Sequence, residues 1–258
     1  MAVLKLVLAY DGTGFHGFAR QPGRRTVEGA LLDGLERILG RRPGLSVAGR
    51  TDAGVHAEGQ VVSLEAEDDP RRLMRALNGM LAPELVVRRA TRAPDGFDAR
   101  RSATARSYRY RIRIGEVPDP FTARYEWHRP GPLSLSPMRR AAGLLLGEHD
   151  FASFCRPRKE GGSTVRRLER LTVRPAGEVL EVRARAGSFL HQMVRSLVGT
   201  LVAVGEGRLE AGAMPEIVKA RDRAAAGPLA PPHGLALVSV HYGAHPRTRG
   251  RSRAAGER

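Results

Sequence analysis

Residues 107–114 limit the fold more than any other stretch, because polar and apolar side chains alternate there without exception. Successive side chains of a strand point to opposite faces of its sheet, so the segment is predicted to be a strand with one core face and one solvated face. Its first aromatic ring, that of Tyr108, is expected at the strand entrance, where it can leave the core and face a cleft. The apolar face holds Tyr108, Tyr110, Ile112 and Ile114, and the basic face holds Arg109, Arg111 and Arg113.

The first part of the chain predicts the element order β-α-β-β-α-β. Residues 3–9 are apolar enough for a central strand, and Thr26 is a good N-cap for a helix that ends near Gly40. Strands are predicted on both sides of residues 48–59, a second helix begins at Asp69 and Pro70, and a strand covers residues 84–90.

The second part repeats this order with one extra helix. A helix follows Ser136, a hairpin turns at Gly177, and a short helix lies near residues 215–220. Ser188 is predicted to cap a long helix over residues 189–204, and residues 235–241 read as the last strand.

The predicted class is therefore α+β, with two ferredoxin-like βαββαβ halves, mainly antiparallel sheets and helices on one face. The expected divisions are residues 1–105, residues 106–243, and a disordered basic tail at 244–258.

Composition points to a polyanionic partner. The 258 residues carry a net charge of +16, and a sequence pI near 11.3 favours binding to nucleic acid. No apolar run is long enough to cross a membrane, and the N-terminus lacks the order of a signal peptide. A single cysteine, Cys155, excludes an internal disulfide and a Cys-rich zinc site, so the expected compartment is the cytoplasm.

Residues 47–60 form the most plausible chemical site. Gly49, Gly54 and Gly59 let the backbone turn tightly or approach another molecule closely. The loop places Arg50 and Asp52 between two predicted strands, and a rigid scaffold of this kind is a common support for reactive residues. From these residues alone, the alternative is equally good: a hairpin connection in which Asp52 only shapes the turn.

The run Gly-Arg-Thr-Asp-Ala-Gly-Val-His at residues 49–56, followed by Gly-Gln-Val at 59–61, resembles the active-site signature of the TruA family of tRNA pseudouridine synthases. Further similar stretches extend the resemblance over roughly residues 3–242. It implies an isomerase that converts uridine to pseudouridine at positions 38–40 of the anticodon stem-loop, on a flipped-out base in a cleft between the halves. It also implies tRNA as partner, a homodimer, and no cofactor or metal.

By the same resemblance, Asp52 takes the role of the catalytic nucleophile. A nucleophilic carboxylate must be ionised in a closed pocket, so a nearby cation is needed. Arg195, in a segment similar to the family motif whose arginine pairs with the aspartate, is that candidate; the alternative is that it points to solvent. Tyr108 matches the tyrosine that stacks on the base and whose hydroxyl is a candidate for removing the C5 proton.

Three further residues are expected to contact the RNA or the base. Arg50 resembles the residue that helps to hold the base out of the stack, and Leu237 matches the apolar wall of the pocket, although it is equally an ordinary buried strand residue. Arg20 lies in a glycine-rich segment that is expected to follow the RNA backbone.

Two other functional classes compete with the isomerase. A non-catalytic RNA-binding protein needs only basic charge and tyrosines, but it leaves the Asp52 loop unexplained. A metal-dependent nuclease would use Asp11, His16, Asp52 and His56, although no pair among them has a recognised metal-ligand spacing.

Overall fold

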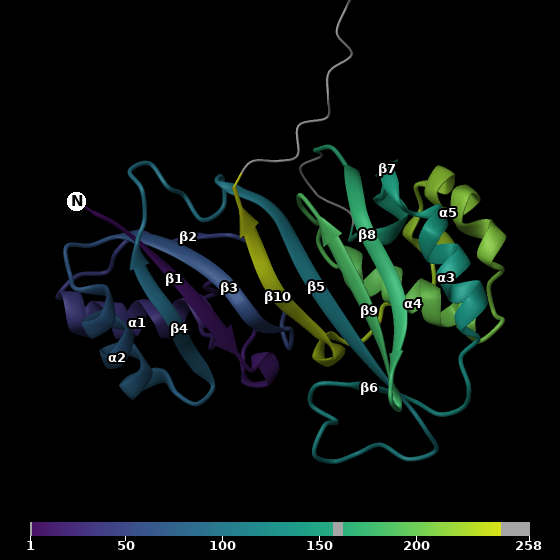
Figure 1. The fold of residues 1–258 in the computed structure, drawn as a ribbon, viewed down its shortest axis with the longest axis horizontal. Helices are drawn as coiled ribbons and strands as arrows, with labels where there is room; N and C mark the ends of the chain where they lie inside the picture. Colours follow the sequence, from purple (N-terminus) through teal and green to yellow (C-terminus); the bar gives the residue numbers. More distant parts are fainter. Residues whose placement is uncertain (1, 157–161, 244–258) are drawn as a thin grey trace, which may run out of the picture.

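The computed structural model describes residues 2–156 and 162–243. Its central feature is one mixed, mostly antiparallel sheet whose strands run in the order β4-β1-β3-β10-β5-β9-β8-β7, with the short β2 paired to β3 and β6 paired to β5 (Figure 1). The predicted basic tail, residues 244–258, lies outside the described residues. Because helices accompany this mostly antiparallel sheet, the protein has the α+β class that the sequence predicts.

The first part of the chain supplies one end of this sheet. β1 pairs antiparallel with both β3 and β4, as expected for a central strand, and β2 adds to the other edge of β3. The elements are β1 (Val3–Tyr10), α1 (Val27–Leu39), β2 (Ser46–Val47), β3 (His56–Glu65), α2 (Pro70–Leu81) and β4 (Leu85–Arg92).

The second part supplies the other end, where β5 pairs antiparallel with β9 and β10. The predicted hairpin is confirmed as β8 and β9. The elements are β5 (Ala103–Ile114), β6 (Trp127–Arg129), α3 (Leu135–Leu144), β7 (Gly147–Asp150), β8 (Val165–Ala176), β9 (Val179–Ala186), α4 (Met193–Gly205), α5 (Met214–Ala220) and β10 (Leu235–Tyr242).

The strand β10 joins the two ends into one sheet. It runs antiparallel to β5 and parallel to the start of β3, where Ala236 and Leu237 lie beside His56 and Ala57. The two strands approach closely, since a Cβ on Gly59 would lie 2.4 Å from the carbonyl oxygen of Val238. Only glycine fits at this crossing.

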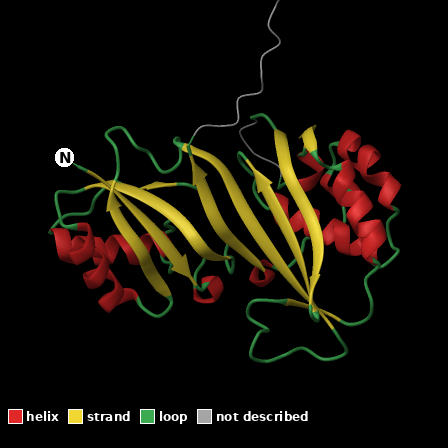
Figure 2. Cartoon of the chain, in the orientation of Figure 1, coloured by secondary structure: helices red, strands yellow, loops and turns green. Residues whose placement is uncertain are grey.

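Two groups of helices pack near the two ends of the sheet (Figure 2). The side chains that the strands turn toward them, including Leu6 and Ile112, belong to one buried cluster that runs through both parts of the chain. Two predicted helix starts are confirmed: the Thr26 side chain accepts a hydrogen bond from the amide of Gly29, and Asp69 accepts one from Arg72. These caps satisfy backbone donors that the helix cannot satisfy itself.

Two predicted boundaries are wrong. The long helix begins at Met193 rather than Phe189, because Gln192 adopts a left-handed conformation (φ 64°) that ends the irregular segment before it. Leu190 is nevertheless buried in the same core as the apolar residues of α4, so it fits the helical spacing of the sequence although it lies before the helix. Tyr108 lies in the middle of β5, not at its entrance, because the strand already begins at Ala103.

Within the described residues, the structure contains no helix that is both long and apolar enough to cross a membrane.

Candidate active site

The loop that carries Asp52 connects β2 to β3 and is held by the segment that follows β1. The amide of Phe18 donates to the carbonyl of Thr51 at 3.0 Å, and the amide of Gly54 donates to the carbonyl of Phe15 at 3.3 Å. A Cβ on Gly12 would lie only 2.1 Å from the carbonyl oxygen of Val55, so no larger residue fits there without moving one of the two loops. The position of Asp52 is thus fixed by backbone contacts.

Buried polar side chains brace the same loop from beneath. The hydroxyls of Tyr10 and Thr51 are hydrogen-bonded at 2.7 Å, and the amide nitrogen of Gln60 donates to the carbonyl of Gly49 at 2.5 Å. Gln60 is completely buried. A buried polar network whose members are all bonded makes a loop rigid.

His56 at the start of β3 ties together four segments of chain. Its Nδ1 accepts a hydrogen bond from the amide of Gly12 at 3.0 Å, which makes Nε2 the protonated nitrogen. Nε2 then donates to the carbonyls of Arg124 and His233, at 2.9 and 3.0 Å. The sequence predicts a role for His56 only in the nuclease alternative, whereas the structure places it as a support for the loops around Asp52.

Asp52 faces two basic side chains from the segment before α4 and from its first turn. Nη1 of Arg195 lies 3.3 Å from Oδ2, and Nε2 of His191 lies 3.2 Å from Oδ1. The predicted partnership of Asp52 with Arg195 is present in the structure, and the alternative that Arg195 points to solvent is not. The Asp52 side chain is 23 % exposed, so a substrate can reach it.

Tyr108 lies on the helix-facing side of β5, close to the same loop. Its ring packs edge-on against Phe189 with centroids 5.1 Å apart, and its hydroxyl lies 3.8 Å from the place where a Cβ on Gly49 would be. Burial raises the pKa of the hydroxyl well above its usual range, with smaller contributions from Tyr10 and Asp52. Tyr108 is therefore a neutral phenol at physiological pH.

The three predicted substrate contacts lie in different surroundings. Arg50 and Arg20 are exposed, Arg50 beside Asp52 and Arg20 in the segment that supports the loop. Leu237 is completely buried in β10, paired with Tyr108 on one side and Ala57 on the other. Its placement is that of a core residue next to Tyr108.

The four residues of the nuclease alternative do not converge. Asp11 lies 3.2 Å from His56, but Asp52 faces Arg195 and His191, and His16 is exposed. Asp11 also accepts a hydrogen bond from the Tyr125 hydroxyl at 2.9 Å. The bond from Tyr125 to Asp11 and the bonds of His56 to backbone groups give both residues a structural role in holding loops together.

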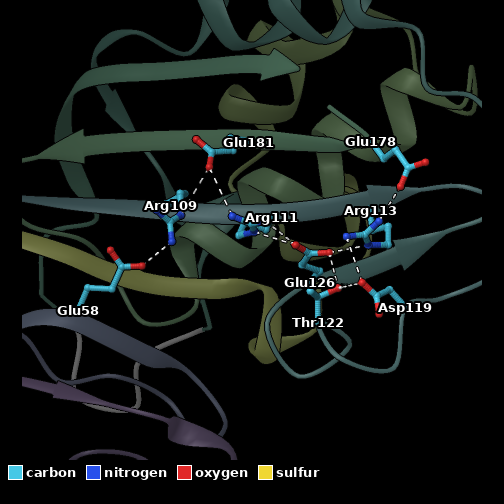
Figure 3. Close-up of polar contacts among 9 residues, drawn as sticks. All are labelled: Glu58, Arg109, Arg111, Arg113, Asp119, Thr122, Glu126, Glu178 and Glu181. Carbon is cyan, nitrogen blue, oxygen red and sulfur yellow. Dashed lines mark hydrogen bonds and ion pairs between the residues drawn. The ribbon is translucent and has the colours of Figure 1, made fainter. Parts of the chain in front are cut away.

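The basic face of β5 is not the free solvated face that the alternation predicts. Figure 3 shows carboxylates bound along the whole row of arginines. The carboxylate of Glu126, which is 3 % exposed, accepts hydrogen bonds from Arg111, Arg113 and the hydroxyl of Thr122. Burial alone would raise the pKa of Glu126, but hydrogen bonds from Arg111, Thr122 and Arg113 outweigh it and lower the pKa. The other partners in the row are Glu58, Asp119, Glu178 and Glu181.

The carboxylates neutralise the arginines of this row and so reduce the ability of this side of the sheet to bind a polyanion. Each arginine in the row already has at least one carboxylate partner, so none is a free phosphate contact. The site around Asp52 and Tyr108 lies on the opposite, helix-facing side of the sheet, away from this row.

Known proteins with similar sequences identify the chain. A family model described as tRNA pseudouridine synthase matches residues 141–243. The tRNA pseudouridine synthase A of Methylobacterium nodulans is 44 % identical over 92 % of this chain and 95 % of its own length, and that of Frankia casuarinae is 46 % identical over 96 % and 92 %.

Among solved structures, the archaeal box H/ACA sRNP Nop10-Cbf5 complex aligns over 77 % of this chain and 44 % of that one, with 14 % identity and a TM-score of 0.33. A likeness of that size supports no argument. The two sequence relatives match this chain over nearly its full length and nearly all of their own. The protein belongs to the TruA family of tRNA pseudouridine synthases and isomerises uridine to pseudouridine in tRNA.

Proposed function

We propose that the reaction takes place at Asp52, on uridines 38–40 of the anticodon stem-loop, with the target base flipped out of the stack. The observation that carries this proposal is the position of the Asp52 carboxylate, 3.3 Å from the Arg195 guanidinium yet 23 % exposed. A carboxylate that lies beside a fixed cation and remains open to the substrate is well placed to act as a nucleophile.

The chemistry requires one bond to be exchanged for another. The N1–C1′ bond of uridine breaks, the base turns, and a C5–C1′ bond forms; C5 loses a proton and N1 gains one. The oxidation state of the whole nucleoside does not change, so the protein's own side chains suffice for the reaction. Asp52 forms a temporary covalent bond to C6 or to C1′ and is released when the product forms.

Tyr108 is proposed to stack on the flipped base and to take part in the transfer of the C5 proton. Its hydroxyl has no hydrogen-bond partner among the described residues, and its high pKa makes it a neutral phenol. Proton transfer by a positioned side chain of this kind is a common catalytic device. Leu237, in the neighbouring strand, would support Tyr108 from within the core, consistent with its complete burial.

Arg50 and Arg20 are proposed to contact the RNA. Both are exposed on segments that also hold or carry Asp52, so phosphates bound there would lie near the reacting base. Arginine forks suit phosphate groups. Flipping a base costs a few kcal/mol, and phosphate contacts of this kind offset that cost.

We further propose two ferredoxin-like units, residues 1–105 and 106–243, with the RNA cleft between them. The strand order β4-β1-β3-β2 in one unit and β10-β5-β9-β8 in the other supports this. Each corresponds to fourth, first, third and second strand once the short additional strands β6 and β7 of the second unit are set aside. A homodimer and a cytoplasmic location complete the proposal, on the resemblance to the family; sedimentation of the purified protein tests the first.

The decisive experiment is Asp52→Asn, which keeps the shape of the side chain but removes the nucleophilic oxyanion. Tritium release from C5-labelled tRNA should vanish, rather than fall by the ~10²–10⁴-fold typical of a lost acid or base. Filter binding of the same tRNA should persist, because many arginines contribute to affinity. The control is Asp95→Asn, which changes an exposed aspartate far along the sequence from the loop.

Each outcome of this experiment decides between functions. Turnover by the Asn variant removes Asp52 as nucleophile. Loss of binding together with activity favours a purely structural Asp52. Mapping of pseudouridine in tRNA treated with the wild-type enzyme then tests positions 38–40 independently of the mutant.

A further inference from the structure

Arg106, the fourth residue of β5, is a buried arginine whose partners are all backbone carbonyls. It is 8 % exposed. Nε and Nη2 donate to the carbonyl of Ala48 at 3.0 and 2.6 Å, Nη1 donates to Ala103 and Gly187 at 3.2 and 2.7 Å, and Nη2 also donates to Arg100 at 3.1 Å. An arginine has five N–H donors, and here all five are engaged.

The charge of Arg106 has no carboxylate partner. Within residues 2–156 and 162–243, no ion pair joins it to an acidic side chain, although other arginines of the same strand bind up to three. Burial lowers its pKa, and only nearby tyrosines act in the opposite direction. A buried cation held by dipoles alone costs stability. A function that needs this guanidinium would explain why it is tolerated.

The segments that Arg106 binds are those that bring the reactive groups together. Ala48 is the first residue of the loop that carries Asp52, and Gly187 is the first residue of the irregular segment that leads to His191 and Arg195. The bonds to these two carbonyls are the shortest of the set, at 2.6 and 2.7 Å. One guanidinium therefore fixes the beginning of both segments whose side chains meet at Asp52.

Arg106 also lies next to the third proposed catalytic side chain. Its Cγ is 4.0 Å from the place where a Cβ on Gly49 would be, and the Tyr108 hydroxyl is 3.8 Å from the same point. Arg106 and Tyr108 lie two residues apart on one face of β5. A shift of the guanidinium would therefore displace both the Asp52 loop and the tyrosine ring.

We propose that Arg106 is a positioning residue of the isomerase, which sets the Asp52 loop, the segment leading to Arg195, and Tyr108 in register from behind the site. The proposal rests on Asp52 being the reactive carboxylate. Arg106 does not touch the substrate; it acts through the backbone of Ala48 and Gly187. Reacting groups misplaced by about 1 Å can lose on the order of 10²-fold in rate.

Only arginine can fill this place. A lysine ammonium retains the charge but has three donors on a single atom, so it cannot reach the carbonyls of Ala48, Gly187 and Arg100 from one position. Arg106→Lys therefore separates the geometry of the fork from its charge. Arg106→Ala removes both and leaves space in which free guanidinium can bind.

The test compares kcat and the KM for tRNA in these two variants with the wild type, alongside thermal unfolding of each protein. We expect kcat of Arg106→Lys to fall on the order of 10²-fold while KM changes little, because no tRNA contact is lost. Millimolar guanidinium should restore part of kcat to Arg106→Ala, and equal sodium chloride or methylammonium should not. Arg113→Lys is the matched control, since Arg113 lies on the same strand but binds carboxylates on the opposite face.

Asp52→Asn is assayed in parallel to separate this proposal from the one it rests on. If Asp52→Asn is inactive and Arg106→Lys turns over like the wild type, only the role of Arg106 is wrong. If Asp52→Asn is active, both proposals are wrong. Unfolding of both Arg106 variants, or a folded Arg106→Ala that guanidinium does not restore, would also overturn the positioning role and leave Arg106 as a stabilising residue.

Discussion

Nη1 of Arg195 lies 3.3 Å from Oδ2 of Asp52, while Nε of the same guanidinium donates to the carbonyl of Ala230 at 2.8 Å. The second bond holds the plane of the guanidinium, so the charge is presented to Asp52 in a fixed direction. Asp52 and Arg195 come from the two parts of the chain, 143 positions apart. The site therefore exists only when both parts are folded against each other.

Arg195→Met should lower kcat by at least ~10²-fold, on the scale of a lost electrostatic contact in a closed site. Methionine keeps helix propensity and bulk, so the protein should still fold, although the carbonyl of Ala230 loses its hydrogen bond at a cost of about 1–3 kcal/mol. Single-turnover tritium release from C5-labelled tRNA measures the effect. Activity close to that of the wild type would show that Asp52 needs no counter-charge.

His191→Asn should reduce kcat less than Arg195→Met does. The His191 side chain is 48 % exposed and that of Arg195 only 12 %, and the interaction of Asp52 with a more exposed side chain is weakened more strongly by water. The two variants are compared in one assay at the same salt concentration. A larger loss for His191→Asn would assign proton transfer to that residue.

Tyr108→Phe separates stacking from proton transfer. The ring that packs on Phe189 is retained, so affinity for tRNA should stay near that of the wild type. If the hydroxyl moves the C5 proton, kcat should fall by ~10²–10⁴-fold. Stopped assays give kcat and filter binding gives affinity. Full activity in the Phe variant would limit Tyr108 to stacking.

Gly12→Ala should impair both folding and turnover, because the new Cβ would lie 2.1 Å from the carbonyl of Val55 and push the Asp52 loop away. A local overpacking of this kind typically costs about 1–3 kcal/mol. Urea unfolding and kcat are measured on the same preparation. Gly44→Ala is the control, since no atom lies within 4 Å of its Cβ position; equal behaviour of the two variants would contradict the prediction.

Stability should decline at alkaline pH. Burial raises the pKa of Tyr10 from 10.0 to about 12, and it raises those of Tyr108, Tyr110 and Tyr242 further. These tyrosines ionise more readily in the unfolded chain, so the stability they contribute is complete below pH 10.0 and is lost as the pH rises toward the folded-state values. For Tyr10 this is worth roughly 2–3 kcal/mol.

Tyr110→Phe tests whether the ionisation of buried tyrosines lowers stability as the pH rises. The variant should be less stable at neutral pH by about 1–3 kcal/mol, because the carbonyl of Pro231 loses its hydrogen bond. Its loss of stability above pH 10.0 should nevertheless be shallower than in the wild type, since one titrating group is gone. Urea unfolding across this range gives both quantities; a parallel pH dependence would contradict the assigned shift.

The features that sequence predicts best are those with a local signal. Thr26 and Asp69 mark helix starts because their side chains bond to amides a few residues away, and the alternation around Tyr110 marks a strand. The pairing of Asp52 with Arg195 was accessible only through resemblance to a family, since no local rule joins residues so far apart.

The features that sequence misses depend on the backbone or on distant chain. Arg106 and His56 bind carbonyls, which every residue has, so nothing in the sequence marks their partners. The sequence does not predict the start of α4, because Gln192 adopts a left-handed conformation that is uncommon for a residue with a side chain. The row of arginines on β5 reads as solvated because its acidic partners come from several other segments.

The strand β10 has a consequence for synthesis of the protein. It follows the nine other strands in sequence, yet it lies between β3 and β5 in the middle of the sheet. Until residues 235–242 emerge from the ribosome, β5 and the start of β3 each keep an open edge, which can pair with another nascent chain. Insertion of this strand closes both edges and brings Leu237 beside Tyr108. Catalytic competence would then appear late and all at once, as the final step of folding.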